Sequence, residues 1–345
     1  MYRIHVLPAQ FGDSLLIEYG SAKPKRILID AGTKGSYKAV KKAIEAIPPK
    51  QRVFELLVVT HIDIDHIGGI LPLLDDAKNL GVTFKEIWFN GYEHLTDLLG
   101  AKQGEQLSSR IVTGGYPWNA KFNERAVVVP DKGKLPVKTI AGMKITLLSP
   151  MREQLLKLEK EWDKTIRAAG LVPGVGAKKS PEEIDDLLGD TPIDVDALAA
   201  SDFKSDTSPP NGSSIAFVAT YDGKSVLFGA DAFPGVLTRN LVRMTPAERK
   251  QIKVLKLPHH GSRNNLDNEL LKALSCNRYL ISSNGDRYSH PNREPIARIL
   301  KRGNKPRLFF NYRSDFNECW DSDDLRKAHK YTTVYGAEDG LVVEV

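Results

Sequence analysis

The feature that most constrains the fold of this chain is a ten-residue segment, T-H-I-D-I-D-H-I-G-G at 60–69. It joins an apolar run of buried-strand type to a stretch with helical periodicity. Four potential metal ligands lie within six residues of it: His61, Asp63, Asp65 and His66. This spacing predicts two metal positions, one using His61 and Asp63 and the other using Asp65 and His66. A helix cap, the ordinary alternative, needs only one carboxylate.

Strand-like and helix-like runs alternate along most of the chain, which favours α/β layering. Strands are expected at 2–7, 14–19, 26–30, 55–60, 126–129, 144–148, 214–220, 225–229, 253–257, 278–282 and 307–310. Helices are expected at 36–47, 67–79, 151–169, 266–274 and 293–301. The stretch 170–213 is rich in Gly, Pro, Ser and Asp, which predicts a long loop with at most a short helix at 181–188. We therefore expect one domain over 1–345 with a helix-plus-acidic-loop insertion near 151–210.

Composition excludes several classes of protein. The 345 residues are 41% hydrophobic and 27% charged, as in globular chains. Two cysteines, Cys276 and Cys319, leave no disulfide framework and no four-cysteine zinc site, and they favour the reducing cytoplasm. We expect no membrane span and no cleaved leader, because no apolar run is long enough and the chain opens on strand-like sequence.

The net charge of +6 permits a nucleic-acid partner, and it is unevenly distributed. Residues 285–313 hold eight basic residues against two acidic ones. They would either track a phosphate backbone or form a solvated helix face. Residues 181–206 hold nine acids against one lysine, which gives them −8 and leaves +14 on the rest of the chain. This acidic segment is either a flap that shields the site or a solvated loop.

Further candidate residues follow three later strands. Asp231 lies in G-A-D-A, where a lone aspartate is either a helix cap or a carboxylate shared by two metals. His259 and His260 lie in P-H-H-G-S, and two adjacent imidazoles are not expected to point into one site together. One is therefore expected as a ligand and the other as its support or as a substrate contact. His290, in S-H-P, either protonates a leaving group, binds an anion, or is structural.

Together these motifs resemble the metallo-β-lactamase fold, and specifically the hydrolase domain of the DNA-uptake protein ComEC and its stand-alone relatives. The resemblance rests on H-x-D-x-D-H at 61–66, G-A-D at 229–231, H-H-G-S at 259–262 and S-H-P at 289–291. Earlier segments also resemble the family, F-G-D-S at 11–14 as its Gly-Asp turn and L-I-D-A-G at 28–32 as its strand-ending Asp motif. N-G-S-S at 211–214 stands where a third-motif histidine is usual.

The resemblance implies an αββα sandwich with a dinuclear metal site at one sheet edge. It implies one metal held by His61, Asp63 and Asn211, a second held by Asp65, His66 and His259, and Asp231 bridging the two. Residues expected to support the ligands or to bind substrate are His260, Asn211, Ser262, Asp13 and Ser283. Asp63 replaces the usual second histidine, and this harder ligand set favours manganese or magnesium while leaving zinc open.

Such a site is expected to hold a hydroxide between two divalent ions, oriented by Asp65 or Asp231, with His290 as acid or phosphate clamp. The expected activity is a phosphodiesterase, most specifically a nuclease with nucleic acid as substrate. Stand-alone relatives suggest DNA processing or anti-phage defence. The alternatives are a hydrolase of a lactone, thioester or cyclic nucleotide, and a binding or scaffold protein with a degenerate site. The intact ligand set argues against the last.

Overall fold

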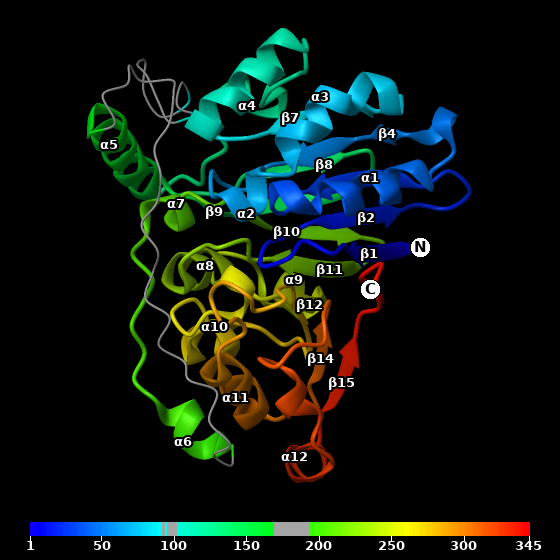
Figure 1. Cartoon of the computed structure of the whole chain (residues 1–345). Helices are drawn as coiled ribbons and strands as arrows, with labels where there is room; N and C mark the ends of the chain where they lie inside the picture. Colours follow the sequence, from blue (N-terminus) through cyan, green and yellow to red (C-terminus); the bar gives the residue numbers. More distant parts are fainter. Residues whose placement is uncertain (92–93, 95–101, 169–192) are drawn as a thin grey trace.

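Two β-sheets form the centre of the computed structural model, which describes residues 1–91, 94, 102–168 and 193–345 (Figure 1). The first sheet has the strand order β16-β1-β2-β3-β5-β7. Its strands are β1 (Tyr2–Val6), β2 (Leu15–Tyr19), β3 (Lys25–Ile29), β5 (Leu56–Val58), β7 (Ile87–Trp88) and β16 (Leu341–Glu344). Strands β16, β1, β2 and β3 pair antiparallel, whereas β3, β5 and β7 run parallel. A separate short pair joins β4 (Val53–Phe54) to β6 (Thr83–Phe84).

The second sheet has eight strands in the order β15-β14-β13-β12-β11-β10-β9-β8. They are β8 (Val137–Ile140), β9 (Met143–Ser149), β10 (Ala216–Tyr221), β11 (Lys224–Phe228), β12 (Ile252–Lys256), β13 (Arg278–Ile281), β14 (Arg307–Phe310) and β15 (Thr332–Tyr335). The strands from β8 to β11 pair antiparallel, and those from β11 to β15 pair parallel. Because parallel strands end at the same edge, the loops after β11, β12 and β13 lie close together.

The inner faces of the two sheets share one apolar core, in which Ile17 and Val58 of the first sheet meet Phe217 and Val254 of the second. Helices cover both outer faces. On the first sheet they are α1 (Tyr37–Glu45), α2 (Ile64–Ile67), α3 (Ile70–Leu80) and α4 (Lys102–Thr113). On the second they are α8 (Pro234–Leu241), α10 (Asn268–Ala273) and α11 (Arg293–Arg302). The αββα sandwich is therefore confirmed. The assignment of 1–345 to one domain stays a prediction.

One predicted strand is wrong, and several elements were not predicted. Residues 126–129 form no strand, because the backbone of Val127 bonds the side chain of Asn90 instead of a neighbouring strand. The unpredicted elements include β8, α8, α9 (Pro246–Gln251), α12 (Asp323–His329), β15 and β16. Strand β16 pairs with β1, so the last strand of the chain edges the first sheet beside the first strand. Among the described residues, no helix is long and apolar enough to cross a membrane.

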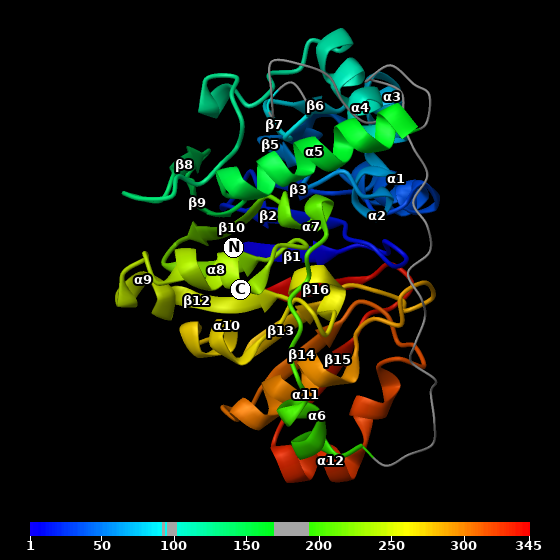
Figure 2. The ribbon, with the colours of Figure 1, turned by 90° about the vertical axis from the view of Figure 1, so that its left-hand side faces the viewer.

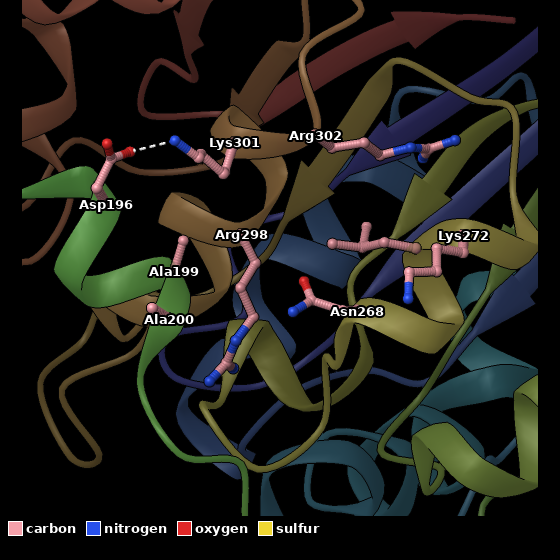
Figure 3. A pocket seen from close by; sticks show the side chains of 9 residues that line it. Asp196, Ala199, Ala200, Asn268, Lys272, Arg298, Lys301 and Arg302 are labelled. Carbon is pink, nitrogen blue, oxygen red and sulfur yellow. Dashed lines mark hydrogen bonds and ion pairs between the residues drawn. The ribbon is translucent and has the colours of Figure 1, made fainter.

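The expected insertion contributes α5 (Arg152–Ala168), α6 (Val195–Ala200) and α7 (Pro209–Gly212), and α5 confirms the helix expected at 151–169. The possible helix at 181–188 and the first part of the acidic segment, residues 181–192, lie outside the described residues. From α6, the chain runs along the outside of the second half of the molecule up to α7 (Figure 2). Helix α6 packs on α11, where Asp196 pairs with Lys301 at 2.7 Å (Figure 3). This return segment, residues 193–208, brings the end of the insertion to the sheet edge.

Candidate metal centre

The loops after β5, β11 and β12 bring most of the candidate ligands together at one edge of the sandwich. His61 follows β5, and the short helix α2 carries Asp65 and His66. Asp231 follows β11 and His260 follows β12. All five residues are buried, none being more than 6% exposed. Asp63 is the N-cap residue of α2, yet its side chain makes no capping hydrogen bond. The helix-cap alternative for this segment therefore finds no support.

One half of the centre contains Asp65, His66 and His260. The Nε2 atoms of His66 and His260 are 3.2 Å apart, and each lies near Asp65 Oδ2, at 3.8 Å and 3.5 Å respectively. Two imidazole nitrogens at this separation fit ligands of one ion, because metal–nitrogen bonds are about 2.0–2.1 Å long. These three side chains form a compact potential ligand group.

The other half contains His61 with Asp63, and Asp231 lies between the two halves. The Nε2 atom of His61 is 3.8 Å from Asp63 Oδ2 and 3.7 Å from Asp231 Oδ2. Asp231 also faces the first half, with Oδ1 3.4 Å from His66 Nε2 and Oδ2 3.7 Å from His260 Nε2. This central position is the one expected of a carboxylate shared by two metals.

The adjacent histidines of P-H-H-G-S both face the centre. His259 and His260 have positive φ angles of 47° and 54°, a left-handed backbone unlike that of a strand or an ordinary helix. As a result, both Nε2 atoms lie 3.7 Å from Asp231 Oδ2. The expectation that adjacent imidazoles cannot share one site is wrong, because the left-handed backbone at both residues lets both imidazoles face Asp231. The structure places His260, and not the expected His259, with Asp65 and His66. His259 lies on the side of Asn211.

Partners of the Nδ1 atoms orient the imidazoles. His66 Nδ1 is 2.8 Å from Asp30 Oδ2, a carboxylate that also accepts from the Thr60 backbone and hydroxyl. His260 Nδ1 is 2.8 Å from the Ser282 carbonyl. Donation from Nδ1 leaves the Nε2 lone pair directed at the centre, as metal-binding histidines require. In the sequence Asp30 belongs only to a strand-ending motif, and this position at the end of a strand is the one signal there of a role at the centre.

A buried ion pair supports His260 from behind. Asp13 Oδ1 lies 3.3 Å from His260 Nδ1, and Asp13 Oδ2 pairs with Lys256 Nζ. Both members of the pair are at most 2% exposed. Burial by itself raises the pKa of Asp13, but Lys256 and His260 outweigh it and lower that pKa to about 2. Lys256 was not predicted, although a lysine at the end of the apolar run I-K-V-L-K was a signal.

A second polar group surrounds Nδ1 of His259. Asp206 Oδ2 lies 3.5 Å from this atom and accepts hydrogen bonds from Asn211 Nδ2 at 2.7 Å and Asn265 Nδ2 at 3.0 Å. Asn265 Oδ1 is also 3.0 Å from His259 Nδ1. Asp206 and Asn265 were not predicted, and neither belongs to a motif that marks it in the sequence.

The carboxylates and imidazoles shift one another's pKa values. Burial alone lowers the pKa of an imidazole, yet Asp231 and its neighbouring carboxylates raise the pKa of His259 to about 9 and that of His66 well above its ordinary value. Burial alone raises the pKa of a carboxyl group, yet His66 and the other imidazoles hold the pKa values of Asp65 and Asp231 below the ordinary range. The centre thus holds ionised carboxylates beside protonated imidazoles. A divalent metal bound to the same side chains would replace those protons and balance the same negative charge.

Unsatisfied atoms show that the residues present fit a metal pair. Among the described residues, His61 Nε2, Asp231 Oδ1 and Asn211 Oδ1 are buried without a hydrogen-bond partner. Buried polar atoms are rarely left so, and each of these is a metal-ligand type. The mixed set of imidazole nitrogens and carboxylate oxygens suits divalent ions such as manganese or zinc.

The remaining predicted residues lie at the margin of the centre. The buried ring of His290 is 5.2 Å from that of His259 and 6.4 Å from that of His260. Burial, and then His259 and His260, hold its pKa well below the ordinary value, so this imidazole is neutral near pH 7. Ser262 and Ser283 accept hydrogen bonds from backbone groups two residues further on, at Asn264 and Gly285. Their predicted contacts with substrate stay predictions.

Part of the basic stretch 285–313 is committed to contacts within the protein. Arg298 is buried and donates to the carbonyls of Leu266 and Ser201, while Arg302 donates to those of Leu274 and Cys276. With Lys301, these side chains line a cavity of about 320 Å³ between α6 and the helices α10 and α11 (Figure 3). The guanidinium groups of Arg298 and Arg302 therefore donate to carbonyl oxygens of the protein itself, and Lys301 pairs with Asp196.

Comparison with known proteins gives one family. The sequence matches the model of the Metallo-beta-lactamase superfamily over residues 7–285. A search of curated proteins found no match.

Several solved structures are similar to this chain at low sequence identity. The metallo-beta-lactamase fold protein YhfI from Bacillus subtilis is 13% identical, with 100% of this chain and 99% of that chain covered and a TM-score of 0.44. Zn(2+)-bound PqqB from Methylobacterium extorquens is 11% identical, with 99% and 100% covered and a TM-score of 0.41. A diphosphatase from the PhnP family is 11% identical, with 100% and 98% covered and a TM-score of 0.39.

Proposed function

Because the chain belongs to the metallo-beta-lactamase superfamily, whose members include metal-dependent hydrolases, we propose that it is a dinuclear phosphodiesterase that cleaves nucleic acid. The observation that carries the proposal is the convergence of three carboxylates, those of Asp63, Asp65 and Asp231, with the imidazoles. Oxygen ligands favour manganese or magnesium, the ions that most often bind phosphate groups in enzymes, and zinc also fits the imidazoles. The net charge of +14 outside 181–206 favours a polyanionic substrate.

We assign His61, Asp63 and His259 to one metal position, Asp65, His66 and His260 to the other, and Asp231 to both. Two divalent ions so held would activate a water molecule and neutralise charge on the phosphoryl oxygens. Asp30 and the Ser282 carbonyl keep His66 and His260 in the tautomer that such ions require.

The residues around the scissile phosphate have separate roles. The ionised Asp231 and Asp65 accept hydrogen bonds from the attacking water and orient it toward phosphorus. His290 is neutral, so it acts by donating an N–H to a phosphoryl or leaving-group oxygen and not as a cation. The motif pattern supports a kinship with ComEC-type hydrolases and a role in DNA processing or defence, and the two free cysteines support a cytoplasmic location.

The proposal is tested by assaying the purified protein with Mn²⁺, Zn²⁺ or Mg²⁺ on labelled single- and double-stranded DNA and RNA. Cleavage that depends on metal is expected. Lactone, thioester and cyclic-nucleotide substrates are assayed in parallel. Turnover of one of these without any cleavage of nucleic acid would overturn the proposal.

A matched pair of variants links the activity to the centre. Asp65→Ala should abolish cleavage and lower metal content, whereas Asp131→Ala, an exposed aspartate near Arg239, should retain both. Full activity in Asp65→Ala, with circular dichroism unchanged, would contradict the assignment of the centre.

A further inference from the structure

Two aromatic rings and one guanidinium form a cluster beside the metal centre. Phe11 lies between β1 and β2, and Tyr288 lies between β13 and α11, yet their rings pack edge to face with centroids 5.7 Å apart and planes at 87°. The guanidinium carbon of Arg287 lies 5.4 Å from the Phe11 ring centroid and 5.2 Å from that of Tyr288. We call Phe11, Arg287 and Tyr288 the rim cluster.

The rim cluster is joined to the metal centre on both of its sides. The Tyr288 ring lies 6.0 Å from the His290 ring, at an angle of 32°, and His290 in turn lies against His259 and His260. On the other side, Phe11 precedes Gly12, where a Cβ atom would be 1.8 Å from the carbonyl oxygen of Asp65. The loop of Phe11 is therefore seated directly on the loop that carries a candidate ligand.

Exposure distinguishes the rim cluster from an ordinary core contact. Phe11 and Tyr288 are only half-buried, and Arg287 is exposed. Aromatic rings placed only to hold two loops together would normally be buried, because that is how they contribute most to stability. Here the rings and the cation are partly or fully exposed. The Tyr288 ring contacts His290, and His290 contacts the two adjacent histidines of the centre. Such a surface is the type on which nucleobases stack, since each base has a π-face and a guanidinium plane stacks on it equally well.

We propose that the rim cluster is a binding subsite for the nucleobase of a nucleotide phosphodiester whose phosphate lies at the metal centre. This inference rests on the proposed phosphodiesterase function and adds a substrate-recognising element to it. The rings of Phe11 and Tyr288 supply stacking area, and Arg287 supplies a planar cation that attracts both the base and the neighbouring phosphate.

The test compares two chromogenic phosphodiesters that share one leaving group. Thymidine 5′-(p-nitrophenyl phosphate) carries a base, and methyl p-nitrophenyl phosphate carries none. The ratio of their kcat/KM values measures base recognition alone. We expect this ratio to fall about 5- to 150-fold in Tyr288→Leu and in Phe11→Leu, the range that corresponds to losing one stacking contact. Tyr288→Phe, which keeps the ring, should restore most of the ratio.

Phe122→Leu is the matched control, because Phe122 is a half-buried ring under the cation of Lys138 elsewhere in the molecule. Its ratio should equal that of the wild type. An unchanged ratio in both rim variants would overturn the inference while leaving the phosphodiesterase function standing.

If the wild type turns over neither diester, that result counts against the proposed phosphodiesterase function. A binding measurement then still tests whether the rim cluster binds a nucleobase. Calorimetric titration with thymidine 5′-monophosphate and with inorganic phosphate, in the presence of Mn²⁺, should show that Tyr288→Leu weakens only the nucleotide. Equal affinity of wild type and Tyr288→Leu for the nucleotide would overturn the subsite.

Discussion

The Oδ2 atom of Asp206 lies 3.5 Å from Nδ1 of His259, so the segment that returns from the insertion ends against the metal centre. The same carboxylate accepts hydrogen bonds from Asn211 and Asn265 and from the backbone of Ser208. Further back, Arg298 donates to Ser201 and lies over the ring of Phe203, which holds the segment on α11. The insertion is thus physically connected to the candidate ligands.

Asp206 is expected to act as a positioning residue for His259. Asp206→Asn removes the negative charge that makes the imidazole a better ligand, while keeping the size of the side chain. We expect the affinity for Mn²⁺ to fall about 10- to 100-fold, as for other carboxylates that orient metal-binding histidines. Competition with a fluorescent chelator measures this affinity directly.

Asp202→Asn is the control for that experiment, because Asp202 lies on the same return segment and is exposed. It should bind metal as the wild type does. If Asp206→Asn matches it, Asp206 has only a structural role.

His260 is expected to be the more important of the two adjacent histidines for one metal position. Because its Nε2 atom lies 3.2 Å from that of His66 and 3.5 Å from Asp65 Oδ2, His260→Ala should lower the bound metal from two equivalents to one. Elemental analysis after dialysis measures the content, with His329→Ala on α12 as the control. Two equivalents retained in His260→Ala, with one lost in His259→Ala, would reverse the assignment.

Lys256 is expected to be essential for stability. Lys256→Met leaves Asp13 as a buried carboxylate without its ion-pair partner, and breaking a buried pair in this way costs about 3–5 kcal/mol. Urea denaturation gives the free energy of unfolding. Lys301→Met breaks an exposed pair with Asp196 and should leave that free energy close to the wild-type value. Equal values for both variants would show that the Asp13–Lys256 pair is dispensable.

Metal binding is expected to strengthen as the pH rises toward 9. Carboxylates around His66 and His259 overcome the effect of burial and raise their pKa values, that of His259 to about 9, so both imidazoles hold protons near neutral pH. A metal must displace these protons in order to bind. For each proton displaced, the apparent affinity rises about tenfold with each unit of increase in pH, as long as the pH is below the pKa of the imidazole. Titration calorimetry with Mn²⁺ at pH 6, 7 and 8 checks this. An affinity independent of pH would mean that no proton is displaced.

The contiguous parts of the centre could be predicted from the sequence, and the parts that join distant loops could not. Asp65 and His66 belong to a motif of six residues directly after a strand, so their presence in the centre followed from local pattern alone. Asp206 and Asn265 meet only because the return segment and the loop after β12 converge. The strand expected at 126–129 failed for a similar reason, since Asn90 satisfies the backbone of Val127 from another part of the chain.

By itself, the sequence determined the layered α/β architecture, the ligand types and their position at strand ends. These follow from hydrophobic periodicity and from polar residues at the ends of apolar runs, both of which are local properties. Only the tertiary structure decided that His260 lies with Asp65 and His66, and that Asp30, Asp13 and Asp206 each lie behind an imidazole. Those relationships depend on which loops meet at the sheet edge and on the left-handed backbone at His259 and His260. A pattern of residue types along the chain does not specify either.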